Sequence, residues 1–152
     1  PAVLTYLPDE RADFYGAPVV YALARRFPDV PFAVVAGTQE KQPAIPNVTY
    51  LGWVTGMAPL YEQYPILLRV ARHDGLPKMV LEALACGNQV IFEYPFAGCR
   101  HARTEEEASA ALGQIIAAGC PVNRAGHEFV ERDYGNEQLV AALLREIGVV
   151  KA

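Results

Sequence analysis

The sequence predicts an α/β fold: a doubly wound, mostly parallel sheet of about five or six strands, with helices on both faces and a helical tail at the C-terminus. Three observations predict it. Short apolar runs alternate five times with segments of helical periodicity. The runs are apolar on both sides, as in parallel strands that helices cover on each face. The 152 residues are 52% hydrophobic and 20% charged, which is typical of one globular domain with its own core.

The expected strands are short runs closed by glycine or by turn-forming residues. In order they are residues 2–7, 32–36, 47–51, 66–70 and 89–92. Helical spacing from Val20 to Phe27 predicts the first helix, and Thr104 followed by three glutamates predicts a capped helix start. The later helices are expected at residues 57–64, 77–86, 104–118, 124–133 and 137–147. No internal repeat interrupts this order, so we expect a single domain over residues 1–152.

Composition excludes several functions. A net charge of -4 and a pI of about 5.4 argue against nucleic acid as a partner, because nonspecific binding needs a broad basic field. The longest apolar runs, such as residues 65–70, are far shorter than the roughly 20 residues of a membrane-spanning helix. Cys86, Cys99 and Cys120 are odd in number and lack metal-ligand spacing, which favours reduced thiols. We therefore expect a cytoplasmic location, peripheral at a membrane as an alternative for the full-length protein, with Cys86 in the core.

The residues best suited to chemistry follow the fourth strand, because ligands of an open parallel sheet bind beyond the carboxyl ends of its strands. Gly75 permits close approach of a ligand to the backbone, and Pro77 suits the first position of a helix. The amides of Lys78 and Met79 are then unpaired at the helix start, where an anion binds favourably. This loop is the expected anion site.

Two carboxylates frame the anion site. Asp74 precedes the helix and Glu82 lies on its second turn, and each can accept hydrogen bonds from sugar hydroxyls. The stretch from Asp74 to Ala83, Asp-Gly-Leu-Pro-Lys-Met-Val-Leu-Glu-Ala, resembles the acidic-x7-Glu motif of retaining, family-four-like GT-B glycosyltransferases (glycosyl transferases group 1). Residues 84–87 and 90–91 resemble the continuation of that motif. Residues 47–48 and 51–54 resemble the family's third strand and its Gly-aromatic loop near the nucleobase.

The resemblance implies that the chain is the C-terminal, donor-binding half of such an enzyme, a Rossmann-like nucleotide-sugar-binding domain. An N-terminal acceptor domain of the same polypeptide would lie outside this chain, so the isolated domain is expected to be inactive. By the resemblance, Glu82 holds the ribose, Asp74 the hexose hydroxyls, and the backbone after Gly75 the diphosphate or sugar. The implied substrate is a UDP-sugar or GDP-sugar, with no metal or other cofactor.

The sequence departs from the family pattern in two ways. Asp74 replaces the usual Glu. The family also has an Arg near the end of its first strand and a Lys shortly after, and here Tyr15-Gly16 stands at the Lys-Gly position. Arg11, Arg72 or Lys78 is expected to substitute as the phosphate cation, unless the donor is held differently or not at all. The candidate catalytic residues are Asp74 and Glu82, and the candidate substrate-binding residues are Arg11, Trp53, Arg72, His73, Gly75, Leu76, Pro77, Lys78 and Met79.

Several candidates have simpler structural interpretations. Glu82 can pair with Lys78 on the helix surface. His73 can be a structural hydrogen-bonding residue rather than a sugar or phosphate ligand. Trp53 is expected to pack beneath the nucleobase or in the core, with stacking on the base as the alternative. A small basic cluster is expected to be solvated in a loop: Arg100, His101 and Arg103.

Two other functions remain open at this stage. The loss of the usual cations favours a non-catalytic nucleotide- or ligand-binding or regulatory module with the same half-fold. An unrelated doubly wound domain, such as a small-ligand or phospho-acceptor module, is the more distant alternative.

Overall fold

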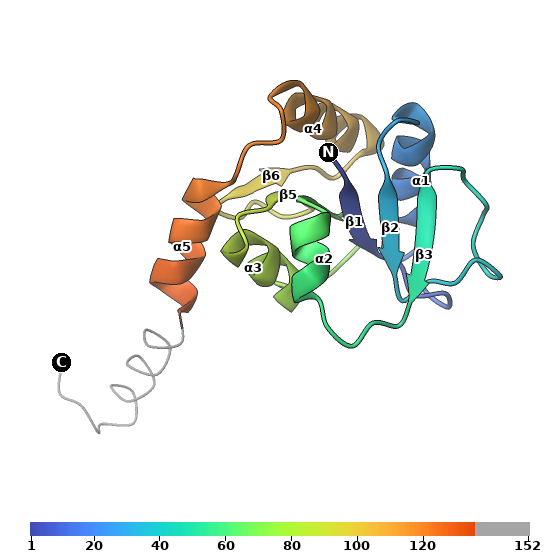
Figure 1. The fold of residues 1–152 in the computed structure, drawn as a ribbon, viewed down its shortest axis with the longest axis horizontal. Coiled ribbons are helices and arrows are strands. Elements are labelled where there is room, and N and C mark those ends of the chain that lie inside the picture. The colour runs from blue at the N-terminus through green and yellow to red at the C-terminus, as the bar shows by residue number, and fades with distance from the viewer. Residues whose placement is uncertain (136–152) are drawn as a thin grey trace.

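The computed structural model describes residues 1–135, which form one sheet of parallel strands covered by helices (Figure 1). The strands are β1 (Val3–Tyr6), β2 (Phe32–Val35), β3 (Val48–Gly52), β4 (Ile66–Arg69), β5 (Gln89–Phe92) and β6 (Cys99–His101). Their order across the sheet is β3-β2-β1-β4-β5-β6, and every neighbouring pair is parallel. The predicted α/β fold with a parallel sheet is confirmed.

Helices cover both faces of the sheet, as Figure 1 shows. They are α1 (Ala17–Arg26), α2 (Ala58–Gln63), α3 (Lys78–Ala85), α4 (Glu105–Ala117) and α5 (Arg124–Tyr134). Side chains of α1 and α4 pack in one core cluster, and those of α2, α3 and α5 pack in the other. Within residues 1–135, no helix is both long enough and apolar enough to span a bilayer.

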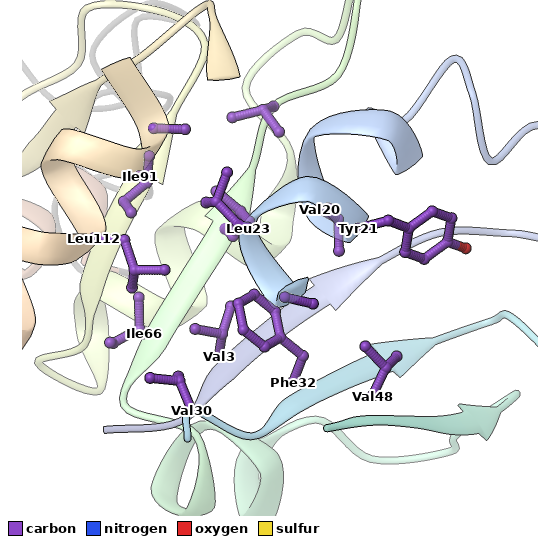
Figure 2. Close-up of a cluster of buried hydrophobic side chains, with 14 of the residues drawn as sticks. Val3, Val20, Tyr21, Leu23, Val30, Phe32, Val48, Ile66, Ile91 and Leu112 are labelled. Atoms are coloured by element: carbon purple, nitrogen blue, oxygen red, sulfur yellow. The ribbon is translucent and has the colours of Figure 1, made fainter. Parts of the chain in front are cut away.

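The two cores draw on alternate residues of the same strands, because successive side chains of a strand point to opposite faces. Figure 2 shows one cluster, in which Ile66 and Ile91 of the sheet meet Leu23 of α1 and Leu112 of α4. The second cluster joins Leu4, Leu67 and Val90 of the sheet to Val80 and Leu84 of α3. All of these side chains are essentially inaccessible to solvent. This burial on both faces is the reason why the strands read as continuous apolar runs.

The five strands expected from sequence agree with the structure to within one residue at each end. β6 lies in a stretch that was expected to be a loop, so the placement of Arg100 and His101 in a loop is wrong. Its residues are only half-buried or exposed at the edge of the sheet, and such a strand has no apolar pattern to reveal it. The helix expected at residues 137–147 lies outside the described residues.

The start of α1 packs directly on the end of β4. Gly16 has a φ of 86°, and a Cβ at this position would lie 2.4 Å from the carbonyl oxygen of Val70. Only glycine combines this left-handed conformation with so close an approach. The contact brings the loop that precedes α1 against the loop that follows β4, which is where the functional site is expected.

The predicted start of α4 is confirmed as a capping box. Thr104 Oγ1 accepts a hydrogen bond from the Glu107 amide over 3.2 Å, and the Glu107 carboxylate accepts one from the Thr104 amide over 3.2 Å. The reciprocal bonds satisfy two donors that a helix start otherwise leaves unpaired.

The three cysteines are free thiols, as expected, but Cys86 is not in the core. It is exposed at the C-terminal end of α3, one residue after the helix ends. Cys99 on β6 is half-buried, and burial raises the pKa of its thiol to about 12.

Candidate functional site

The sheet has a topological switch point between β1 and β4. From β1 the chain moves outward through β2 to β3, and from β4 it moves the other way through β5 to β6. The loops after β1 and β4 therefore diverge and leave a crevice at the carboxyl edge, the usual ligand site of such sheets. The two loops are joined by one hydrogen bond, which the Arg72 amide donates to the Phe14 carbonyl over 2.8 Å.

Arg69, the last residue of β4, places a buried cation at this crevice. Its guanidinium lies over the rings of Tyr6 and Tyr15, at 5.1 Å and 4.7 Å from their centroids. The side chain is 6% exposed. Nε donates to Asp74 Oδ2 over 3.0 Å and Nη2 donates to the same oxygen. Nη1 is buried and has no hydrogen-bond partner among the described residues. The arrangement fixes a positive charge at the switch point and pairs it with Asp74.

Glu93 is a second buried ionisable group beside this cation. It follows β5, and its amide donates to the Arg69 carbonyl over 3.2 Å. The residue is 4% exposed, and within residues 1–135 neither carboxyl oxygen has a hydrogen-bond partner. Burial raises the pKa of Glu93 to about 7, although the charge of Arg69 acts in the opposite direction. Near neutral pH the group is therefore partly protonated.

A cavity of about 400 Å³ opens beside Asp74. It is lined by the β4–α3 loop on one side and by aromatic side chains on the other: His73, Asp74, Gly75, Leu76, Phe92, Tyr94 and Phe96. His73 Nδ1 shares a hydrogen bond with the Tyr94 hydroxyl over 3.0 Å, which gives this histidine a structural partner. An apolar cavity with one carboxylate at its rim can hold a ring with polar substituents.

A second cavity of about 400 Å³ opens beside Glu82, between α2 and α3. Its wall consists of Thr55, Met57, Ala58, Tyr61, Lys78, Glu82, Ala85 and Cys86. The Tyr61 hydroxyl donates to Glu82 Oε2 over 2.8 Å, and Lys78 Nζ lies 3.1 Å from Oε1. Burial and the bond to Glu82 raise the pKa of Tyr61, so the phenol stays a donor. The helix-surface pair with Lys78 thus exists, but Lys78 is exposed and such a pair contributes about 0.5 kcal/mol.

Arg11, Arg72 and Lys78 were the cations expected to replace the Arg and Lys of the family. Within residues 1–135, none of the three lines the cavity beside Asp74. Arg11 lies 5.3 Å from the centroid of the Phe14 ring and lines a separate cavity of about 440 Å³. Arg72 is exposed, and Lys78 lies at Glu82. The cation that contacts Asp74 is Arg69.

The loop between Asp74 and α3 leaves open space around its backbone. A Cβ on Gly75 would meet no atom within 4 Å, and the Gly75 amide donates to Asp74 Oδ1 over 3.1 Å. Pro77 is the N-cap of α3 rather than its first helical residue, and the helix begins at Lys78. Leu76 is exposed at the cavity rim, whereas Met79 packs against the core.

Trp53 does not pack as expected. Its side chain is 80% exposed in the loop after β3, two residues before Thr55, which lines the cavity beside Glu82. The packing interpretation is wrong because this loop carries the indole away from both cores. The basic cluster also differs from expectation, since Arg100 is half-buried and donates to Gln114 of α4 over 3.0 Å.

No protein-family model matches the sequence, and no curated protein is significantly similar to it. Solved structures, in contrast, are similar in fold. A mutant of TarM from S. aureus, in complex with fondaparinux, alpha-GlcNAc-glycerol and UDP, has a TM-score of 0.73 at 13% identity, over 94% of this chain and 34% of TarM. HepE from Anabaena, in complex with UDP and glucose, has a TM-score of 0.69 at 14% identity, over 93% of this chain and 47% of HepE.

A third similar structure is a separate domain. The C-terminal domain of the group 1 family glycosyl transferase LpcC from Francisella tularensis has a TM-score of 0.63 at 12% identity, over 89% of this chain and 85% of that domain. The chain has the fold of a GT-B C-terminal domain. It spans about a third of TarM and about half of HepE. At identities this low, the similarity shows a shared fold and no more.

Sequence reasoning missed Tyr6, Tyr61 and Arg69, which the structure brings to the site. Arg69 carried a signal, because it is a charged residue in the otherwise apolar run from Ile66 to Val70, and buried charges require partners. The tyrosines carried none, since the contacts of Tyr6 with Arg69 and of Tyr61 with Glu82 join distant segments.

Proposed function

We propose that the chain is the donor-binding half of a retaining glycosyltransferase. The enzyme transfers a hexose from a nucleoside diphosphate sugar to an acceptor, which an N-terminal domain of the same polypeptide binds. One observation carries the proposal: Asp74 and Glu82, at the spacing of the family motif, each contribute the carboxylate of a separate cavity beside α3. A donor with a nucleoside at one end and a sugar at the other fits such a pair.

The nucleoside occupies the cavity beside Glu82. The Tyr61 hydrogen bond orients the Glu82 carboxylate, so that its oxygens accept hydrogen bonds from the ribose hydroxyls in place of the exposed Lys78. The exposed indole of Trp53 stacks on the base, which is the minor interpretation of the sequence. TarM and HepE were both solved in complex with UDP, so UDP is the first nucleotide to test and GDP the second.

The hexose occupies the cavity beside Asp74. Aromatic side chains from the β5 side support one face of the ring, and Asp74 accepts from its hydroxyls. In the proposed reaction the protein stabilises an oxocarbenium-like sugar and a departing nucleoside diphosphate through placed charges and donors. We propose that no metal or other cofactor takes part; the described residues contain no group of three His, Cys, Asp or Glu side chains suited to a metal. The free thiols favour a cytoplasmic location.

A specific observation favours a second candidate, a non-catalytic binding module. Arg11, Arg72 and Lys78 do not line the cavity beside Asp74, so the expected phosphate cations do not meet the hexose carboxylate. In this alternative the chain binds a nucleotide or another ligand without transferring sugar. Transfer activity of the protein with its N-terminal domain, and no transfer by this chain alone, supports the enzyme; nucleotide binding with no transfer in either form supports the module.

Calorimetric titration with UDP, GDP and their sugars tests the proposal. We expect one nucleotide to bind, and we expect Glu82→Gln to weaken its binding about tenfold, because the neutral amide is a poorer acceptor for the ribose hydroxyls. Glu128→Gln, on the exposed surface of α5, is the matched control and leaves the affinity unchanged. If none of the compounds binds, even when the preceding domain is present, the proposal is wrong.

A further inference from the structure

Arg69 places a buried positive charge at the end of β4, beside the switch point, and neither the sequence motif nor the similar structures assign it a role. We propose that Arg69 binds the diphosphate of the donor and that Asp74 is its counter-ion while the site is empty. This inference rests on the proposed function, since it names the residue that receives the phosphates of the nucleoside diphosphate.

The position of Arg69 is the first argument. Arg69 is the last residue of β4, which pairs with β1 in the sheet. It therefore lies at the switch point, where the strand order reverses. Ligands of doubly wound sheets bind at this point. The cavities beside Asp74 and Glu82 both border the loop and helix that follow β4. A cation at the end of β4 is therefore close to the part of the donor that joins the nucleoside to the sugar.

The geometry of the guanidinium is the second argument. Nε and Nη2 both donate to one oxygen of Asp74, and buried Nη1 has no partner among residues 1–135. One Asp74 oxygen thus accepts from two N–H groups of the planar Arg69 guanidinium. The same two groups have the geometry to bind the oxygens of a phosphate. Nη1 is a further hydrogen-bond donor, and Asp74 does not accept from it.

The two partners of the pair differ in how firmly they are held. The Arg69 side chain is 6% exposed and lies over two tyrosine rings. The Asp74 side chain is 23% exposed. It lies in a loop in which Arg72, His73 and Gly75 are exposed. Cation–π contacts keep the guanidinium in place without its carboxylate. A diphosphate can therefore replace Asp74 at the fork, and the released carboxylate becomes free to accept from hexose hydroxyls in the adjoining cavity.

Other charges near the crevice are less suited to the phosphates. Glu93 is buried beside Arg69 and partly protonated near neutral pH, so Asp74 supplies the main counter-charge. Arg11 is exposed, and its cavity is lined by Asp9 and Glu10 as well as by Lys41. Those carboxylates oppose an anion, and water screens an exposed arginine more than a buried one.

Titration of the full chain with UDP and with uridine separates the phosphate contribution from the nucleoside contribution. In the wild type we expect UDP to bind more tightly than uridine. Arg69→Met is expected to weaken UDP binding about 10- to 100-fold and to leave uridine binding unchanged. Arg25→Met removes an exposed charge from the last turn of α1 and is the control, with both affinities unchanged.

Asp74→Asn gives a second and independent readout. If Asp74 competes with phosphate for Arg69, the neutral amide strengthens UDP binding several-fold without changing uridine binding. A purely structural ion pair gives no such gain. Thermal unfolding establishes which variants fold; should Arg69→Met not fold, Arg69→Lys, which keeps the charge and loses the fork, takes its place.

The outcomes separate this inference from the function on which it rests. If folded Arg69 variants keep the wild-type ratio of UDP to uridine affinity, or if Asp74→Asn fails to strengthen UDP binding, the inference is wrong while donor binding stands. If the wild type binds neither uridine and UDP nor guanosine and GDP, the proposed function is itself wrong and the inference falls with it.

Discussion

Glu93 makes the stability of this fold depend on pH in a way that one substitution can isolate. Burial raises its pKa from 4.5 to about 7, so the folded protein keeps a proton that the unfolded chain has already lost. Below pH 4.5 both forms are protonated and the group has no effect. As the pH rises toward 7, the folded state loses up to about 1.4 kcal/mol of stability for each pH unit, and above 7 the loss levels off. The full rise corresponds to about 3 kcal/mol.

Glu93→Gln keeps the shape of the side chain and removes this titration. We expect the variant and the wild type to differ little in unfolding free energy near pH 4.5, and the variant to gain about 3 kcal/mol on the wild type by about pH 8. Urea unfolding followed by circular dichroism across this range measures the difference. Glu62→Gln, on the exposed surface of α2, is the control for the loss of a negative charge. A difference between Glu93→Gln and wild type that stays constant with pH, or that shrinks as pH rises, refutes the reasoning.

Three further predictions concern the packing and orientation of the site. Gly16→Ala places a Cβ 2.4 Å from the Val70 carbonyl oxygen at a φ of 86°, and we expect it to cost more than about 2 kcal/mol of stability in thermal unfolding. The control Gly119→Ala has a φ of 76° and no atom within 4 Å of the added Cβ, so it should cost about 1 kcal/mol. Equal losses in the two variants would contradict the close contact at Gly16. Thr104→Ala removes the capping box of α4, with an expected loss of about 1 kcal/mol by urea unfolding, and an unchanged midpoint would show that the cap contributes nothing. Tyr61→Phe removes the hydrogen bond to Glu82 and is expected to weaken uridine binding about fivefold in calorimetry, whereas unchanged binding would mean that Glu82 needs no orientation.

Periodicity predicted the strands because the physical cause is local. Parallel strands buried on both faces must be apolar throughout, as β4 and β5 are along most of their length. β6 escaped prediction since its three residues, Cys99 to His101, lie half-buried or exposed at the edge of the sheet. Its partner β5 and the packing of Arg100 on α4 determine its place, and a sequence pattern does not contain these contacts.

The candidate site was predicted in part. The spacing of Asp74 and Glu82 identified two residues that line separate cavities beside α3, but their partners lie far away in the sequence or in unexpected places. Tyr61 is 21 residues from Glu82. Arg69 looked like part of a strand, and its pairing with Asp74 depends on how the β4–α3 loop returns. The exposure of Trp53 in the loop after β3 is likewise set by tertiary structure.

The central claim is that the chain binds a nucleoside diphosphate between the β3–α2 loop and the start of α3. Titration of the isotope-labelled chain with UDP, followed by the amide chemical shifts of its NMR spectrum, tests this claim most directly. We expect the largest shift changes in residues 53–58 and 69–82, and we expect uridine to reproduce only the changes near Glu82. The absence of shift changes with UDP and GDP would contradict the claim. Changes confined to α4 and to β6, at the edge of the sheet away from β3, would also contradict it.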